Sequence, residues 1–361
     1  SITSTVQANT DTGFSIVTYT GTGGVDTVGH GLSAQPELMF IKNRGRAVTG
    51  AAYATGINQT GYLFTAVGGS DGFSTARNDF MNNDTPPTSS LFTVRSYDGA
   101  GNDTQDYVGN YTGDTYVAYL FHSVENFSKF GSYTGNGSEQ LVETGFEPAF
   151  VITKSTSATG HWRMYDNKRG STDSSSSYDG NRKVLYGDLN NAEGNGINEI
   201  RFLSNGFEVG PGNNTNTNGV SFIYMAFAAD PDTTAPTLAD SFSTVTYTGN
   251  GGTQSITGFG FLPSMIWTKG RTVAYDHGLY DSVRGGGSLI YPSLTQAAST
   301  VTNGIQSFDT DGVTFGANNK SNASDSTYAA WAWKADDNEP TIFGGPAIAV
   351  YKFEDNANDV T

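Results

Sequence analysis

Cysteine is absent from the 361 residues of the chain. This excludes disulfide bridges, thiolate metal sites and cysteine nucleophiles together, so stability must come from packing. Basic residues are also scarce, with 19 Lys and Arg against 35 Asp and Glu and a net charge of −16. Because neutralising phosphates requires clustered Lys and Arg, we expect no nucleic-acid partner.

Long apolar runs are missing as well. No stretch approaches the roughly 18 apolar residues that indicate a membrane span, so we expect none. The first residues show no basic segment followed by an apolar one, the pattern of a secretory signal peptide, although a leader that had been removed would leave no trace.

Glycine and aromatic residues, by contrast, are abundant, with 46 Gly, 19 Tyr and 22 Phe. Aromatic side chains favour strands and glycine favours tight turns, while residues that favour helices are few. At roughly 100 to 200 residues per domain, the length predicts two or three domains.

A repeated tripeptide indicates the number of domains. Tyr19, Tyr133 and Tyr247 each begin a Tyr-Thr-Gly, and the intervals from 19 to 133 and from 133 to 247 are both 114 residues. A fourth Tyr-Thr-Gly, at Tyr111, breaks the register, so the tripeptide alone is weak evidence. The prediction of three diverged copies of about 100 residues therefore rests on the ordered signals that follow each tripeptide.

Three such signals follow in the same order. An apolar run begins at a proline and ends at a lysine: Lys42, Lys154 or Lys269. An Asx-Gly dipeptide that suits a tight hairpin turn comes next, at 71–72, 205–206 and 311–312. An aromatic strand then closes each copy, at 115–121, 221–227 and 327–333.

The pattern within each copy is that of β-structure. FSTVTYTG at 242–249 alternates with the period of two of a strand with unlike faces. The lysine-ended run and the closing strand are apolar on both faces, which is typical of a strand between two layers. We predict an all-β fold of three tandem β-sandwich domains of a jelly-roll-like kind, with the order of strands left open.

Shifts in composition predict the boundaries. We expect a polar N-terminal arm at 1–13 and three repeats: repeat 1 at 14–126, repeat 2 at 127–230 and repeat 3 at 242–335. Linkers are expected at 231–241 and 336–346, and the start of a further β-domain that resembles laminin-G is expected at 347–361. The junction between repeats 1 and 2 is too short for independent tumbling.

Repeats 2 and 3 share a further motif, Asp-x-x-Arg-Gly, at 166–170 and 281–285, which repeat 1 lacks. Together with Tyr-Thr-Gly-Asn-Gly, Gly-Phe-x-Pro and the closing strand, it resembles the uncharacterised repeat domain of structural proteins in marine tailed bacteriophages, over residues 14–335. The resemblance implies a virion surface protein, often with a laminin-G-like domain after the repeats. It implies no ligand residues.

The Asp-x-x-Arg motif allows two interpretations. The pairs Asp166 with Arg169 and Asp281 with Arg284 form either a charged binding edge for a glycan or ion pairs that hold a turn, which at a surface stabilise little.

The tryptophans divide in the same way. Trp162 lies beside Arg163 in a polar stretch, so we expect it to be exposed and to contact a ligand together with Arg163. The other three lie on apolar strands and are expected in the core: Trp267, Trp331 and Trp333.

No motif for catalysis or metal binding stands out. The four histidines, His30, His122, His161 and His277, fall at unmatched places in the copies, and no nucleophile elbow or zinc-binding helix motif is present. The acidic stretch 97–106 has oxygen ligands suited to calcium but lacks EF-hand spacing, and a solvated loop is the other interpretation. We predict no catalytic residues, no metal and no cofactor, although paired carboxylates for glycoside cleavage meet only in the fold.

These observations predict a non-enzymatic virion protein of a tailed bacteriophage, a tail fibre or similar appendage on the particle surface in contact with the host. Its expected partners are other virion proteins, a host-surface glycan and copies of itself, as a homotrimer if it forms a fibre. The alternatives are a capsid decoration or vertex protein, a virion enzyme that degrades polysaccharide, and a bacterial surface adhesin.

Overall fold

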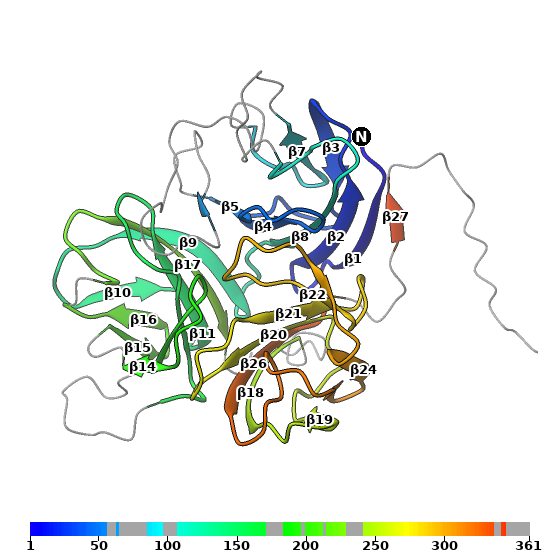
Figure 1. Ribbon diagram of the computed structural model, residues 1–361. Coiled ribbons are helices and arrows are strands. Elements are labelled where there is room, and N and C mark those ends of the chain that lie inside the picture. Colours follow the sequence, from blue (N-terminus) through cyan, green and yellow to red (C-terminus); the bar gives the residue numbers. More distant parts are fainter. Residues whose placement is uncertain are drawn as a thin grey trace, which may run out of the picture.

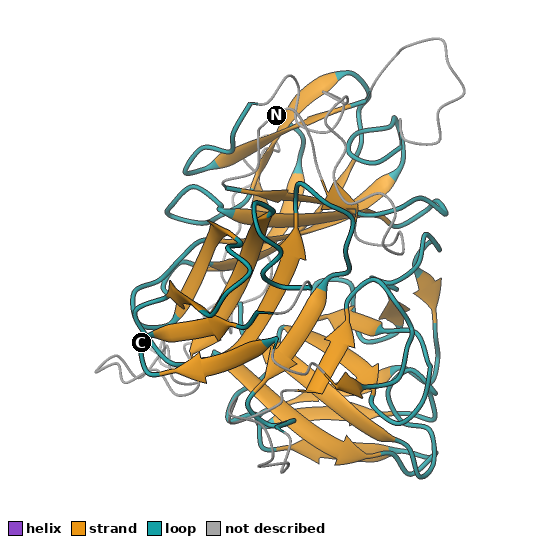
Figure 2. Ribbon diagram, turned by 90° about the vertical axis from the view of Figure 1, so that its left-hand side faces the viewer, coloured by secondary structure: helices purple, strands orange, loops and turns teal. Residues whose placement is uncertain are grey.

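The computed structural model describes residues 1–55, 63–64, 85–96, 107–170, 183–195, 199–211, 214–228, 241–335 and 341–343. These residues form strands, turns and loops only, and Figure 2 shows the strands stacked in several layers. The predicted all-β class is confirmed. Within the described ranges no helix has the length and apolar character needed to cross a membrane.

Each repeat contains one large antiparallel sheet. In repeat 1 the hydrogen-bonded order of its strands is β27 (Thr341–Phe343), β1 (Ser4–Asn9), β2 (Phe14–Thr20), β8 (Thr115–Phe121), β4 (Leu38–Asn43), β5 (Ala51–Ala54) and β6 (Leu63–Phe64). In repeat 2 it is β14 (Gly194–Asn195), β13 (Lys183–Tyr186), β12 (Arg163–Asp166), β11 (Pro148–Ser155), β17 (Ser221–Ala228) and β9 (Ser128–Thr134). In repeat 3 it is β18 (Phe242–Thr248), β26 (Thr327–Trp333), β20 (Met265–Gly270) and β21 (Gly278–Asp281).

A smaller sheet covers the outer face of each large one. The small sheets are β3 (Val25–Gly29) with β7 (Leu91–Arg95); β10 (Gln140–Glu143), β16 (Gly206–Val209) and β15 (Ile200–Leu203); and β19 (Gln254–Thr257), β25 (Gly312–Phe315) and β24 (Ile305–Asp309). A short pair, β22 (Ser288–Leu289) with β23 (Ser299–Thr300), flanks repeat 3. Apolar side chains from both sheets form one core in each repeat, as Phe207 of β16 and Val151 of β11 do in repeat 2. Each repeat is thus a β-sandwich.

The strand that closes each repeat is buried on both faces. In β8, Tyr116, Ala118 and Leu120 point into the core of repeat 1. The alternate residues Val117 and Tyr119 point the other way, into a second cluster with residues of all three repeats, which we call the shared core. Because the large sheet lies between two apolar layers, both of its faces require apolar side chains.

Three aromatic rings lie at the centre of the shared core. Phe121, Phe227 and Trp333 are each the seventh residue of their closing strands, and the intervals from 121 to 227 and from 227 to 333 are both 106 residues. Their ring centroids are 6.1, 5.8 and 6.5 Å apart, close to an equilateral triangle. The repeats surround this point as three lobes, with repeat 1 in blue to cyan, repeat 2 in green and repeat 3 in yellow to red (Figure 1). An approximate threefold axis therefore passes through one chain.

The Tyr-Thr-Gly signal has a structural cause. Each tyrosine stacks on the second residue of its closing strand, with centroids 5.0 to 5.3 Å apart, in the pairs Tyr19–Tyr116, Tyr133–Phe222 and Tyr247–Tyr328. The glycine of each tripeptide passes close to another backbone: a Cβ on Gly135 would lie 2.3 Å from the carbonyl oxygen of Thr217. Only glycine fits there.

A buried asparagine that sequence inspection missed supports the same turn. The Oδ1 of Asn216 accepts a hydrogen bond from the backbone N–H of Asn136 at 2.9 Å, and its side chain is fully buried. Asn110 and Asn322 occupy the same place in the other repeats, with the same 2.9 Å distance. The two intervals of 106 residues between these asparagines were the available signal.

The predicted hairpin turns are confirmed at 205–206, between β15 and β16, and at 311–312, between β24 and β25. The dipeptide at 71–72, the acidic stretch 97–106 and the domain expected at 347–361 lie outside the described residues, as does nearly all of the linker 231–241.

The polar arm expected at 1–13 is wrong, because residues 4–9 form β1 and pair with β2 over six positions. Within the expected linker 336–346, β27 pairs with the other edge of β1. The chain that leaves repeat 3 thus returns to the sheet of repeat 1. Mixed Ser, Thr and Gln give little apolar periodicity, so the strand could not be identified without its pairing partners.

The central position of Phe227 generates a stability prediction. Phe227→Ala removes a ring that is 1% exposed and contacts residues of all three repeats. We expect a loss of about 3–5 kcal/mol in the free energy of unfolding. Guanidinium denaturation followed by tryptophan fluorescence measures it. Leu141→Ala, at a side chain 44% exposed on β10, is the control and should change stability by less than about 0.5 kcal/mol. Equal effects of the two variants would show that the axis is not a packed core.

Candidate functional site

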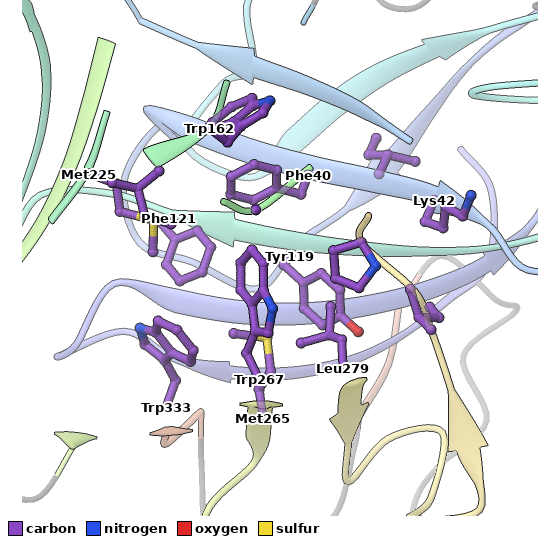
Figure 3. Close-up of a pocket in the computed structure, with 15 residues that line it drawn as sticks. Phe40, Lys42, Tyr119, Phe121, Trp162, Met225, Met265, Trp267, Leu279 and Trp333 are labelled. Atoms are coloured by element: carbon purple, nitrogen blue, oxygen red, sulfur yellow. The ribbon is translucent and has the colours of Figure 1, made fainter. Parts of the chain in front are cut away.

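The approximate axis contains a small apolar cavity. It has a volume of about 60 Å³ and is lined by residues of all three repeats, with Phe40, Trp162, Trp267 and Tyr119 among them (Figure 3). The Tyr119 hydroxyl is already bound to Asp281. A space of this size without a free polar group to orient a ligand is a packing gap between unlike repeats.

The Asp-x-x-Arg motif forms buried ion pairs. The Nε of Arg284 donates to Oδ2 of Asp281 at 2.6 Å, and both side chains are fully buried. The Asp281 Oδ1 accepts the backbone N–H of Arg284 at 2.8 Å, which closes a turn. Arg169 and Asp166 form the same arrangement at 2.6 Å. These residues therefore hold turns, the second interpretation, and none of the four side chains lies at the surface to form a charged edge.

Each of these pairs binds a side chain from a different repeat. The Tyr119 hydroxyl, on β8 of repeat 1, donates to Asp281 Oδ2 at 2.7 Å and accepts from Arg284 Nη2 at 3.1 Å. Burial raises the pKa of Tyr119 well above its usual value, so the hydroxyl stays protonated and remains a donor.

The boundary between repeats 2 and 3 repeats this design with another donor. The Nε1 of Trp331, on β26, donates to Asp166 Oδ2 at 3.0 Å, and the Arg169 guanidinium lies 5.5 Å from the Trp331 ring. Tyr119 and Trp331 are both the fifth residue of their closing strands. One rule thus applies at two boundaries: a closing-strand donor enters the Asp-x-x-Arg turn of the neighbouring repeat.

At the third boundary, between repeats 1 and 2, the equivalent position is apolar. In repeat 3, Asp281 pairs with Met265 of β20, and at the equivalent position of repeat 1, Ala54 pairs with Leu38 of β4. Repeat 1 therefore has an alanine in place of the aspartate. The fifth residue of the closing strand of repeat 2 is Met225, and both Ala54 and Met225 lie in the shared core. Because one buried charge without its partner is costly, the polar set is present or missing as a whole.

Three buried lysines occupy equivalent positions, and two of them cross the boundaries. Lys42, Lys154 and Lys269 are at most 6% exposed, and burial lowers the pKa of each to about 8. Lys269 Nζ donates to the carbonyl oxygen of Asn190 in repeat 2, and Lys42 Nζ donates to that of Leu294 in repeat 3.

His277 of repeat 3 also binds repeat 2. Its Nε2 lies 2.7 Å from the carbonyl oxygen of Tyr186 and 3.0 Å from that of Leu189, so Nε2 carries the proton. Its Nδ1 accepts the Trp267 Nε1–H at 2.7 Å. Burial lowers the pKa of His277 to about 3, which keeps the ring neutral.

The predicted exposure of Trp162 is wrong. Trp162 is 5% exposed, and its ring lies 5.5 Å from that of Phe40 in repeat 1. Its neighbours in the sequence are polar because they bind distant carboxylates, His161 with Asp188 and Arg163 with Glu199. The core positions of Trp331 and Trp333 are confirmed at 0 and 1% exposure, and Trp267 packs partly buried against the shared core.

Arg163 lines a polar pocket of about 80 Å³ on repeat 2. Arg163 belongs to a buried network around Glu199, which lies behind the lining: Arg163 Nη1 lies 2.7 Å from both carboxylate oxygens, and the Tyr165 hydroxyl donates to Oε2 at 2.6 Å. Asn214 Nδ2 donates to Oε1 at 2.7 Å. Of the six residues predicted to bind a ligand, Arg163 is the one at this pocket.

The rim of the pocket carries a histidine and hydroxyl groups. His161 Nδ1 lies 2.9 Å from Oδ2 of Asp188, which orients the ring. Ser155 and Thr159 line the same space. The pocket therefore presents hydrogen-bond donors and acceptors side by side, above a charge pair that is already neutralised.

One family comparison matches the chain. The model of a domain of unknown function (DUF7483) matches residues 1–231 and 237–343, so the chain belongs to this family. No curated protein matches the chain.

The buried turn of repeat 3 generates a second prediction. Asp281→Ala leaves Arg284 charged and unpaired in the interior, and we expect a loss of about 3–5 kcal/mol. The triple variant Tyr119→Met, Asp281→Ala, Arg284→Met copies the apolar third boundary and should recover most of that loss in urea unfolding. A triple variant no more stable than Asp281→Ala would contradict the equivalence of the boundaries.

His277 generates a pH prediction. Its folded pKa of about 3 lies below the usual 6.5, so its contribution to stability is complete above about pH 6.5 and is lost as the pH falls toward 3. The unfolding free energy should decrease between pH 7 and 5, and His277→Gln should make that decrease smaller. Guanidinium titrations across this range test it, with Leu141→Ala keeping the wild-type slope. An unchanged slope in His277→Gln would contradict the prediction.

Proposed function

From the premise that the chain is a DUF7483 protein, we propose that it is a non-enzymatic structural protein of a tailed-phage particle, a tail fibre or similar appendage that contacts the host surface. Its partners in this role are other virion proteins and a host-surface glycan. A homotrimer is the expected assembly if it forms a fibre.

The observation that carries the proposal is the shared core. Three sandwiches that bury their inner faces against one another form one body of three lobes around a common centre (Figure 1). A rigid body that presents several loops suits multivalent attachment, because weak contacts add without an entropic cost for ordering the domains.

The charged pairs that recur in repeats 2 and 3 join the repeats to one another, which supports a binding or spacing role. The Asp-x-x-Arg pairs make hydrogen bonds to a neighbouring repeat, as in the Tyr119–Asp281 contact. Groups held in this way fix the relative positions of the repeats.

Electron microscopy of labelled particles tests the proposal. Gold-conjugated antibodies against residues 14–335 are applied to intact virions from the source lysate. Gold on the tail fibres is the expected result. Gold over the capsid would replace the proposal by a decoration or vertex role, and bare virions beside labelled cells would replace it by a bacterial adhesin.

A further inference from the structure

The pocket of repeat 2 has an internal comparison in repeat 3. In repeat 2, Arg163 pairs with Thr153, the residue before Lys154. In repeat 3 the equivalent residue is Thr268, before Lys269, and it pairs with Gly278. Glu199 precedes the first residue of β15, and Gly304 precedes the first residue of β24. The buried Arg163–Glu199 pair of one repeat is thus a pair of glycines in the other.

This exchange shows that the fold does not require the charged network. Repeat 3 builds the same sheets without it. Removing two charges from water costs several kcal/mol per ion, which their mutual attraction only partly offsets. Polar groups that are buried without a structural need point to a functional site, and here Arg163 of the pair lines a concave space.

The charges around the pocket disfavour ionic ligands. Glu199 already neutralises Arg163, with Nη1–Oε distances of 2.7 Å. The carboxylate of Asp188, 2.9 Å from His161 Nδ1, repels an anion that approaches the rim. A cation would meet the Arg163 guanidinium. The pocket therefore favours a ligand without net charge.

The remaining polar groups define the chemistry of that ligand. The Ser155 hydroxyl donates to the carbonyl oxygen of Ala158 at 2.8 Å, so its oxygen is left to accept. Asn214 uses its amide N–H on Glu199, which leaves its Oδ1 to accept. With Nδ1 of His161 held by Asp188, its Nε2 makes no hydrogen bond within the described part of the chain. Groups that donate and accept at once, such as the hydroxyls of a sugar, match such a surface.

We propose that the pocket lined by Ser155, Thr159, His161, Arg163 and Asn214 binds one neutral sugar unit. The pocket volume of about 80 Å³ suits part of a single ring rather than an extended chain. The inference rests on the proposed function in one respect: it names a neutral sugar as the chemical class of the host-surface contact that the proposal gives to the appendage.

Saturation-transfer NMR on the purified full chain tests the site. The probes are glucose, galactose, mannose and N-acetylglucosamine, with glucuronate and inorganic phosphate as charged competitors, all at millimolar concentrations. We expect saturable binding of at least one neutral sugar. Stronger binding of glucuronate or phosphate, or no saturable binding of any neutral sugar, would overturn the proposal.

Three variants locate the binding. Thr159→Arg places a bulky side chain on the exposed rim and should weaken sugar binding about 10-fold or more, equivalent to about 1.4 kcal/mol. The double variant Arg163→Gly, Glu199→Gly copies repeat 3 and should have the same effect while the thermal transition is retained. Ala274→Arg, five residues after Lys269 as Thr159 is after Lys154, is the matched control and should bind as the wild type does.

The variants also separate the two proposals. Wild-type binding in Thr159→Arg and in the double variant would show that the sugar binds elsewhere, and the pocket assignment would be wrong. Because the measurement uses the isolated chain, it does not depend on where the protein lies on a particle. Virions without gold would contradict the appendage and leave the sugar site standing.

Discussion

The structure depends on the burial of three sheet faces against one another. Each closing strand presents alternate side chains to its own sandwich and to the shared core, and Phe121, Phe227 and Trp333 meet where the three inner faces converge. Burying aromatic side chains of this size is the largest favourable contribution available to a chain without disulfides. The lobes are therefore parts of one body and not beads on a linker.

Packing alone does not set the order of the repeats around the axis, because apolar faces pack without strong direction. The directional contacts are polar: Tyr119 with Asp281 and Trp331 with Asp166 each join one closing strand to one neighbouring turn. A buried donor requires its acceptor, since an unpaired polar group in the interior is costly. The apolar residues Ala54 and Met225 show that the boundary between repeats 1 and 2 needs no polar pair at this position once the other two boundaries are fixed.

Divergence among the copies separates framework from function. The stacked tyrosine and the buried asparagine recur because every copy needs them to close its sandwich, and the final aromatic residue recurs because every copy contributes it to the shared core. The Arg163–Glu199 network occurs in repeat 2 and is replaced by glycines in repeat 3. A feature that one copy has and another omits on the same framework is a candidate for a role outside folding.

Local patterns in the sequence were sufficient for the all-β class, the hairpin turns at 205–206 and 311–312, and the core positions of Trp331 and Trp333. Each depends on neighbouring residues, through strand periodicity or turn chemistry. Tertiary structure alone decided that residues 4–9 form a strand, that Trp162 is buried and that the Asp-x-x-Arg pairs lie between repeats. Those outcomes depend on partners far away in the chain, such as Phe40 for Trp162, and the local character of a segment does not show which partner will cover it.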